Sequence, residues 1–185
     1  MLAWVATAGA CAWTRAPWTR QAWEPDALRE EIARRVGDAT PAELVVPFEL
    51  DAETLARAHR AVVGHAAPSE RAQLLLDFMF DHPGGLHLVY GLGATATARD
   101  TVAAGQGNCL ALASVFIGLA RSVGLRAYYL DASARAGEVL DEGDLIVNVG
   151  HITAVVETER GELAMDFGWG VQRTASLERI DDLEL

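Results

Sequence analysis

The spacing of apolar and polar residues predicts helices in the first two thirds of the chain. Apolar positions three and four residues apart indicate an amphipathic helix. This spacing, with capping residues or helix breakers at its ends, recurs over 26–36, 51–63, 68–80 and 108–123. The last of these segments is apolar nearly all round, as expected of a helix buried at the centre of a domain.

Segments typical of strands dominate the remainder of the chain. Strands are expected over 125–132, 148–157 and 162–167, with a polar loop over 133–144 between the first two. One earlier strand is expected at 44–50, where Pro47 favours the edge of a sheet. Helices followed by a run of antiparallel strands predict an α+β fold.

The length and the pattern favour one compact domain with an extension before it. A chain of 185 residues, about half of them apolar, can bury a substantial core. Residues 1–43 hold several Trp and Pro and one short helix, and we interpret them as an N-terminal extension. The domain itself is expected over 44–185.

Charge excludes some classes of partner. The net charge is −11, and Arg supplies all of the positive charge because the chain has no Lys. Nucleic acid and anionic membrane surfaces attract basic proteins, so neither is expected as a partner. Nothing in the sequence indicates an organic cofactor, and the oligomeric state stays open.

The two cysteines lie in different contexts, which argues against a disulfide framework. Cys11 ends the stretch Ala8–Cys11, which resembles a bacterial lipobox, so residues 1–11 could be the remnant of a lipoprotein signal. The positive residues that open a signal peptide do not precede it. Cys11 is therefore a candidate lipidation site, and both a cell-envelope and a cytoplasmic location stay open.

Cys109 stands at the first turn of the predicted central helix. Helix N-termini stabilise negative charge and lower the pKa of a thiol. Gly105 and Gly107 let the backbone come close to a bound carbonyl, and Gln106 could donate a hydrogen bond to it. Asn108 is a suitable N-cap for the helix. The ordinary alternative is that Cys109 is a small buried apolar residue.

His151 and Asp166 lie on the two strands of the predicted hairpin. If 151–156 pair with 161–166 around a four-residue loop, His151 lies directly opposite Asp166. A tighter turn at Arg160–Gly161 would instead pair Asp166 with Val155. With the wider loop, the three residues have the parts for thiol acyl transfer. Cys109 would attack a carbonyl, His151 would move the proton, and Asp166 would orient the imidazole.

The same segments resemble those of a known family. GQGNCLALASVFIGLARSVGLRAYYLDA, VGHITAVVE and GELAMDFGW are similar to the transglutaminase-like superfamily, over roughly Ser69 to Leu185. Within that family, the segments resemble bacterial proteins with a Gly-Asn-Cys-Leu motif, often lipoproteins or fused to tetratricopeptide repeats. The resemblance implies a papain-like core, in which a helix that carries the cysteine packs on an antiparallel sheet.

The resemblance also implies the site residues. It places a catalytic triad on Cys109, His151 and Asp166. From the residues themselves, Asn108 and Gln106 are candidates for the oxyanion and substrate region. Trp169 could line the mouth of a groove, or equally pack in the core or against the hairpin. Many relatives have an aromatic residue soon after the histidine and a proline after the aspartate, whereas Ile152-Thr153 and Phe167-Gly168 stand here. These departures leave the substrate class open.

Three functions compete. The leading hypothesis is a cysteine peptidase, amidase or acyltransferase that acts on an amide or ester carbonyl of a peptide or protein. The second is a non-catalytic module that binds a peptide or protein and keeps a vestigial triad. The third is a metal site made by the same three residues, which lacks the paired Cys or His spacings of zinc sites.

Overall fold

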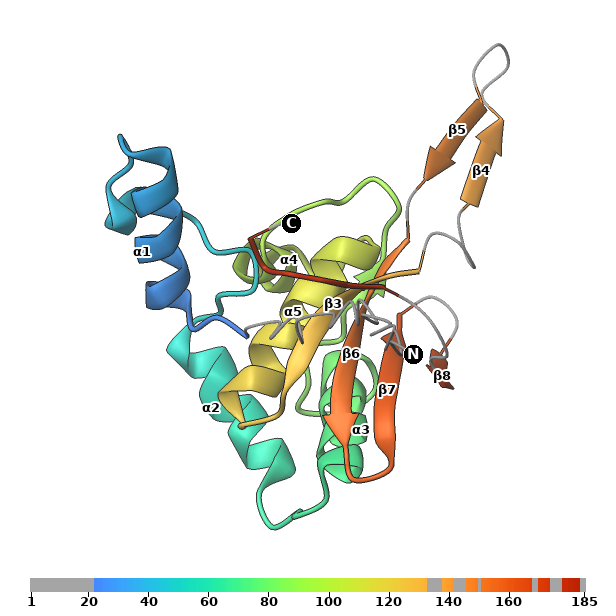
Figure 1. Ribbon diagram of the computed structural model, residues 1–185. Coiled ribbons are helices and arrows are strands. Elements are labelled where there is room, and N and C mark those ends of the chain that lie inside the picture. Colours follow the sequence, from blue (N-terminus) through green and yellow to red (C-terminus); the bar gives the residue numbers. More distant parts are fainter. Residues whose placement is uncertain are drawn as a thin grey trace, which may run out of the picture.

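The computed structural model describes residues 22–132, 138–141, 146–149, 151–167, 170–173 and 178–183. Helices come first along the chain and strands follow, as Figure 1 shows. The helices are α1 (Pro25–Val36), α2 (Ala52–Val62), α3 (Pro68–Phe80), α4 (Ala98–Ala104) and α5 (Cys109–Ser122), with a 3-10 turn at Pro41–Glu43. Four of these confirm the predicted helices. The short α4 was not predicted.

Within the described residues, the main sheet has five strands in the order β8-β7-β6-β3-β9, and all neighbouring strands are antiparallel. Its strands are β3 (Ala127–Asp131), β6 (Ile152–Thr158), β7 (Gly161–Asp166), β8 (Gly170–Arg173) and β9 (Glu178–Ile180). Two small two-stranded sheets are separate from the main sheet. They are antiparallel β4 (Glu138–Asp141) with β5 (Ile146–Val149), and parallel β1 (Val89–Tyr90) with β2 (Gln106–Gly107). The α+β prediction is confirmed.

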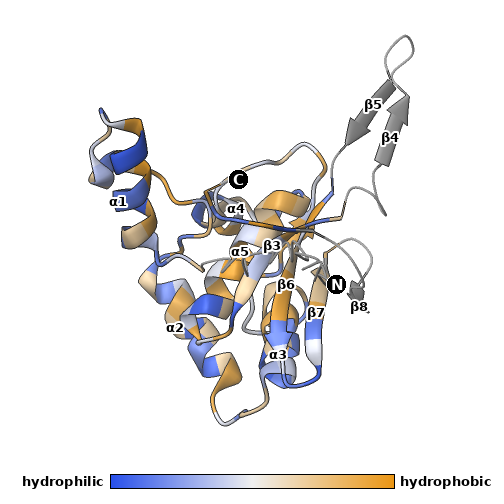
Figure 2. Cartoon of the chain, viewed as in Figure 1, coloured by the Kyte–Doolittle hydropathy of each residue, from blue (hydrophilic) through white to orange (hydrophobic). Residues whose placement is uncertain are grey.

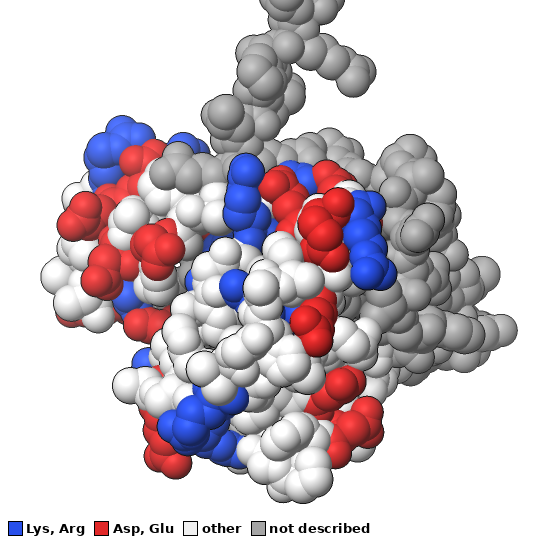
Figure 3. Space-filling view, turned by 90° about the horizontal axis from the view of Figure 1, so that it is seen from below, with Lys and Arg blue, Asp and Glu red and all other residues white. Residues whose placement is uncertain are grey.

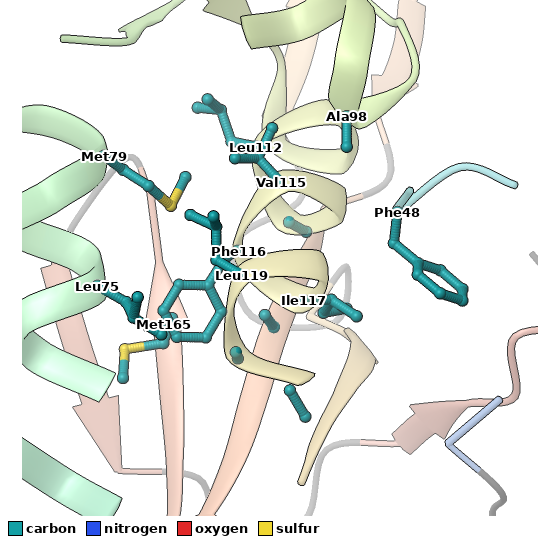
Figure 4. Packing of buried hydrophobic residues seen from close by; sticks show 14 of the residues in the cluster. Phe48, Leu75, Met79, Ala98, Leu112, Val115, Phe116, Ile117, Leu119 and Met165 are labelled. Atoms are coloured by element: carbon teal, nitrogen blue, oxygen red, sulfur yellow. The ribbon is translucent and has the colours of Figure 1, made fainter. Parts of the chain in front are cut away.

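Helix α5 forms the centre of the core. Every residue from Ala111 to Ala120 is buried, because this stretch has no charged residue to turn towards water. The helix contacts β3 and β6 of the sheet and also α2, α3 and α4. In Figure 4, Phe116 points towards Leu75 and Met79 of α3 and towards Met165 of β7.

Hydropathy follows this arrangement. In Figure 2 strand β6 is hydrophobic along most of its length, whereas α1 is largely hydrophilic. On the face in Figure 3, acidic and basic side chains are interspersed and do not form separate patches. In the part of the chain that the structure describes, no helix is long and apolar enough to cross a bilayer.

The strand expected at 44–50 is wrong. The segment is irregular with one turn, and Val46, Phe48 and Leu50 are buried in the main core. Its backbone does not pair with a strand of the described chain. The carbonyl of Pro47, for example, accepts a hydrogen bond from Ala98 N–H (2.7 Å). A Cβ on Gly118 of α5 would lie 2.2 Å from Phe48 O, so glycine is required where this segment crosses the helix.

Two other expectations about strands need correction. The strand expected over 148–157 is two strands, β5 and β6, which belong to different sheets. The loop expected over 133–144 contains β4, which pairs with β5. Apolar residues run through both β5 and β6, so the pattern does not mark where one strand ends and the next begins.

The C-terminal end of α5 holds a buried ion pair. Arg121 and Asp182 have side chains only 8% and 2% exposed, and their atoms Nη1 and Oδ2 are 2.6 Å apart. The remaining donors of Arg121 bind the carbonyls of Ala127 and Trp23, and its guanidinium lies over the ring of Phe48. The Trp23 N–H in turn donates to Asp182 Oδ2. This arrangement ties the beginning and the end of the described chain to one helix.

Asp182→Asn should lower the free energy of unfolding by about 3 kcal/mol, because it leaves a buried guanidinium without a counter-charge. Urea denaturation measures the loss. The matched control is Arg34→Gln, which breaks a surface pair with Glu31 and should cost far less. Equal losses in the two variants would contradict the role given to the buried pair.

Candidate active site

Cys109 is the first residue of α5, as predicted. Asn108 caps the helix, and its Oδ1 accepts a hydrogen bond from Ala111 N–H (3.0 Å). Its Nδ2 donates to Thr95 Oγ1. The side chain of Asn108 therefore fixes the start of the helix, and its predicted contact with substrate remains a prediction. At the first turn of a fourteen-residue helix, unsatisfied N–H groups favour a thiolate.

The loop before Cys109 is held by short backbone contacts. Strand β1 pairs with β2, and the Gly91 N–H donates to Gly107 O (3.0 Å). The next residue, Asn108, donates its N–H to Ala94 O (3.0 Å). Gly107 itself is buried, and a Cβ there would lie 2.8 Å from Thr101 Cγ2 and 2.9 Å from the Ala111 Cβ. Only glycine fits at this position without displacing α4 or α5.

His151 is brought to the thiol, as predicted. It lies just before β6, it is 9% exposed, and its carbonyl accepts a hydrogen bond from Ala132 N–H (2.8 Å). That bond continues the pairing of β3 with β6 and fixes the backbone of His151 at the end of the sheet. The side chain of His151 lies close enough to Cys109 to lower the pKa of its thiol.

Opposing effects set the pKa of the Cys109 thiol. Burial raises it, because the charged thiolate is poorly solvated where the residue is only 8% exposed. The side-chain hydrogen bond with His151, backbone hydrogen bonds from Ile152 and Leu110, and the charge of His151 lower it. The lowering effects prevail, and the pKa of Cys109 lies below the usual value for a thiol.

The register predicted for the hairpin is wrong by two residues. Ala154 pairs with Met165 and Thr158 with Gly161, so the turn consists of Glu159 and Arg160. Neither the four-residue loop nor the alternative turn at 160–161 is formed. Extended by one residue, the observed register places Asp166 opposite Thr153 rather than His151.

The correction leaves the parity of the two predicted positions unchanged. A shift of two residues preserves the alternation of a strand, so His151, Thr153 and Asp166 occupy positions of the same parity. His151 and Asp166 become diagonal neighbours instead of direct ones. The structure describes the backbone of Asp166, which pairs with Gly170 on its other side.

The other predicted site residues lie in different surroundings. Gln106 is exposed in β2, and its carboxamide lies beside Gly91. Trp169 and Cys11 lie outside the described residues. Among the described residues, no group of three or more His, Cys, Asp or Glu side chains is placed to bind a metal ion.

Two threonines at the site were missed. Thr95 holds the capping side chain of Asn108, and Thr153 is 2% exposed and donates its hydroxyl to Met165 O. A polar residue at an inward position of the apolar run ITAVV was a signal for the second. For Thr95, the sequence offered no signal beyond a nearby polar stretch.

The family model of the transglutaminase-like superfamily matches residues 55–169, which include the central helix and the hairpin. The chain belongs to this superfamily. The match covers more than half of the chain and contains Cys109, His151 and Asp166. The family resemblance stated from the sequence is thereby confirmed.

Two solved structures are similar to the chain. The periplasmic domain of TgpA from Pseudomonas aeruginosa is 22% identical, with a TM-score of 0.49, over 70% of this chain and 48% of that one. A protein described as a candidate cysteine protease from Cytophaga hutchinsonii is 13% identical, with a TM-score of 0.46, over 80% and 58%. The chain spans about half the length of these proteins. Among curated proteins, none matches the chain.

Gly107→Ala should displace the loop that leads to Cys109, because the added methyl would overlap Thr101 and Ala111. Overpacking of this kind costs about 1–3 kcal/mol. The midpoint temperature of thermal unfolding and the rate of Cys109 alkylation by iodoacetamide should both fall. In the control, Gly93→Ala, the methyl meets no atom within 4 Å, and neither quantity should change by a comparable amount.

Proposed function

We propose that the protein is a thiol enzyme that acts on amide or ester carbonyls through an acyl-enzyme on Cys109. The observation that carries the proposal is that the imidazole of His151 acts on the Cys109 thiol, at the N-terminus of a buried helix, and lowers its pKa. Buried cysteines that serve only packing are surrounded by apolar groups, which raise the pKa of the thiol. Here the surroundings lower it.

In the first step, the Cys109 thiolate attacks the carbonyl carbon and forms the S–C bond. The proton of the thiol resides on His151, which gives it to the leaving amine or alcohol as the C–N or C–O bond breaks. Negative charge collects on the carbonyl oxygen in the transition state. N–H groups at the first turn of α5 and the exposed carboxamide of Gln106 are the candidate donors to that oxygen.

In the second step, a water or an amine attacks the thioester carbon and gives its proton to His151, and the C–S bond breaks to restore the Cys109 thiolate. Water gives hydrolysis, and an amine gives transfer of the acyl group. Asp166 acts on the imidazole, where it favours the tautomer that accepts a proton from the thiol and stabilises the imidazolium. A peptide or protein is the substrate class that supplies such amides.

The test is the pH dependence of Cys109 alkylation by iodoacetamide in a Cys11→Ser background. The thiolate is the reactive form, so a lowered pKa makes the reaction half-maximal below about pH 8.5, the value for a free cysteine. His151→Ala removes the main lowering contact and should raise that midpoint. His59→Ala, an exposed histidine of α2, serves as control and should leave it unchanged.

A midpoint near that of free cysteine, unaffected by His151→Ala, would refute the proposal. It would favour the competing hypothesis of a peptide-binding module, which has no need of a reactive thiol. If the midpoint is lowered as expected, the products formed from amide and ester substrates, with and without an added amine, would distinguish hydrolysis from acyl transfer.

Thr153→Val should also raise the midpoint of alkylation. The lost hydroxyl binds Met165 O at the end of the β6–β7 pairing, one residue before Asp166, so its loss loosens the backbone that presents Asp166. The hydrogen bond is worth about 1 kcal/mol, which limits the rise to about 0.7 pH units.

The control for Thr153 is at the other end of the same hairpin. Thr158 Oγ1 donates to Gly161 O (2.7 Å), so Thr158→Val removes a similar bond far from the thiol. It should affect stability alone, and Thr153→Ser should restore the wild-type pH profile. A purely structural role for Thr153 would give the same pH midpoint in both valine variants.

A further inference from the structure

Exposed apolar side chains gather in one short segment. On the described surface, the large hydrophobic residues exposed by more than 40% are Val36, Val45, Val63, Val89, Tyr90 and Leu92. Three of them fall within residues 89–92, which we call the apolar ledge. The other three are scattered singly, as is ordinary for a protein surface.

The apolar ledge borders the loop that carries Cys109. Val89 pairs with Gln106 and Tyr90 with Gly107, two residues before the thiol. The Val89 N–H donates to Gly105 O (3.0 Å), and this bond anchors the start of the ledge. A ligand whose carbonyl reaches Cys109 therefore passes close to residues 89–92.

The chain on both sides of this contact is free of formal charge. Residues 88–98 and 101–120 contain no Asp, Glu, Arg, Lys or His, in a protein with 26 acidic and 15 basic residues. No charged side chain of these segments is present to pair with a charged group of a ligand. An ionic ligand group would lose water here without gaining a partner from them, whereas an apolar group gains from burial.

We propose that the apolar ledge binds an uncharged, apolar side chain in the acyl portion of the substrate, the portion that stays attached to Cys109 in the thioester. This assignment rests on the proposed function, because it takes Cys109 as the nucleophile. It adds the substrate class: peptides or amides with a large apolar residue next to the reacting carbonyl and no charge there.

The experiment labels Cys109 with peptidyl acyloxymethyl ketones that carry Leu, Gln or Asp next to the reactive group, followed by intact-protein mass. The full chain with Cys11→Ser is used, and each rate is divided by the iodoacetamide rate of the same protein. The leucine probe should react roughly tenfold or more faster than the aspartate probe, in line with burial of one large side chain.

Two variants of the ledge, Val89→Ser and Leu92→Ser, should each reduce this preference several-fold. The matched control is Val63→Ser, which removes an equally exposed apolar side chain just after α2 and should keep the wild-type preference. Sedimentation of all four proteins detects any change in self-association.

Several results would overturn the assignment. One is a reactive, low-pKa thiol with no preference among the probes, which leaves the proposed function intact. Another is a preference that both ledge variants retain. A third is a change of oligomeric state in the ledge variants, which would make the ledge a contact between copies of the chain. Failure of the proposed function is recognised separately, by a thiol that iodoacetamide alkylates only near the pH of free cysteine.

Discussion

Residues 111–120 of α5 are buried on every side, because helices α2, α3 and α4 and strands β3 and β6 pack around this helix. Burial of this apolar surface is the main favourable term available to the domain. The close crossing at Gly118, the contacts of Phe116 with α3 and the packing of β3 and β6 follow from it. A helix fixed so completely also fixes its first residue, and that residue is Cys109.

The thiol sits where two physical effects oppose each other. Burial that makes α5 a rigid support also removes water from the thiolate and disfavours it. The imidazole of His151 and the backbone of Ile152 reverse that effect. Ile152 is the first residue of β6 and His151 lies just before it, so the end of the sheet that packs on α5 also supplies the contacts that lower the pKa of the thiol.

Much of this arrangement could be predicted because its signals are local. Caps such as Asp51 and Asn108 and breakers such as the glycines at 84–85 mark helix ends within a few residues. The capping pair Thr97 and Asp100 was an equally local signal for α4, hidden by a stretch of small residues. The α+β class followed from the order of these elements.

The features that escaped prediction are set by distant parts of the chain. The 44–50 segment alternates like a strand, yet its partners are the helix at Gly118 and the N–H of Ala98. The hairpin register depends on which residues form the turn, and turns of two and four residues preserve the same alternation. The pattern therefore placed His151 and Asp166 on one face but could not set their separation.

The ion pair of Arg121 and Asp182 has a consequence for how this domain joins other polypeptide. Trp23 and Asp182 are held at the same guanidinium, so the two ends of the described chain lie together. Arg121 is twelve residues from Cys109 along α5, a distance of about 18 Å. Polypeptide that joins this domain before Trp23 and after Asp182 therefore meets it at one place, the end of the central helix that is far from the thiol.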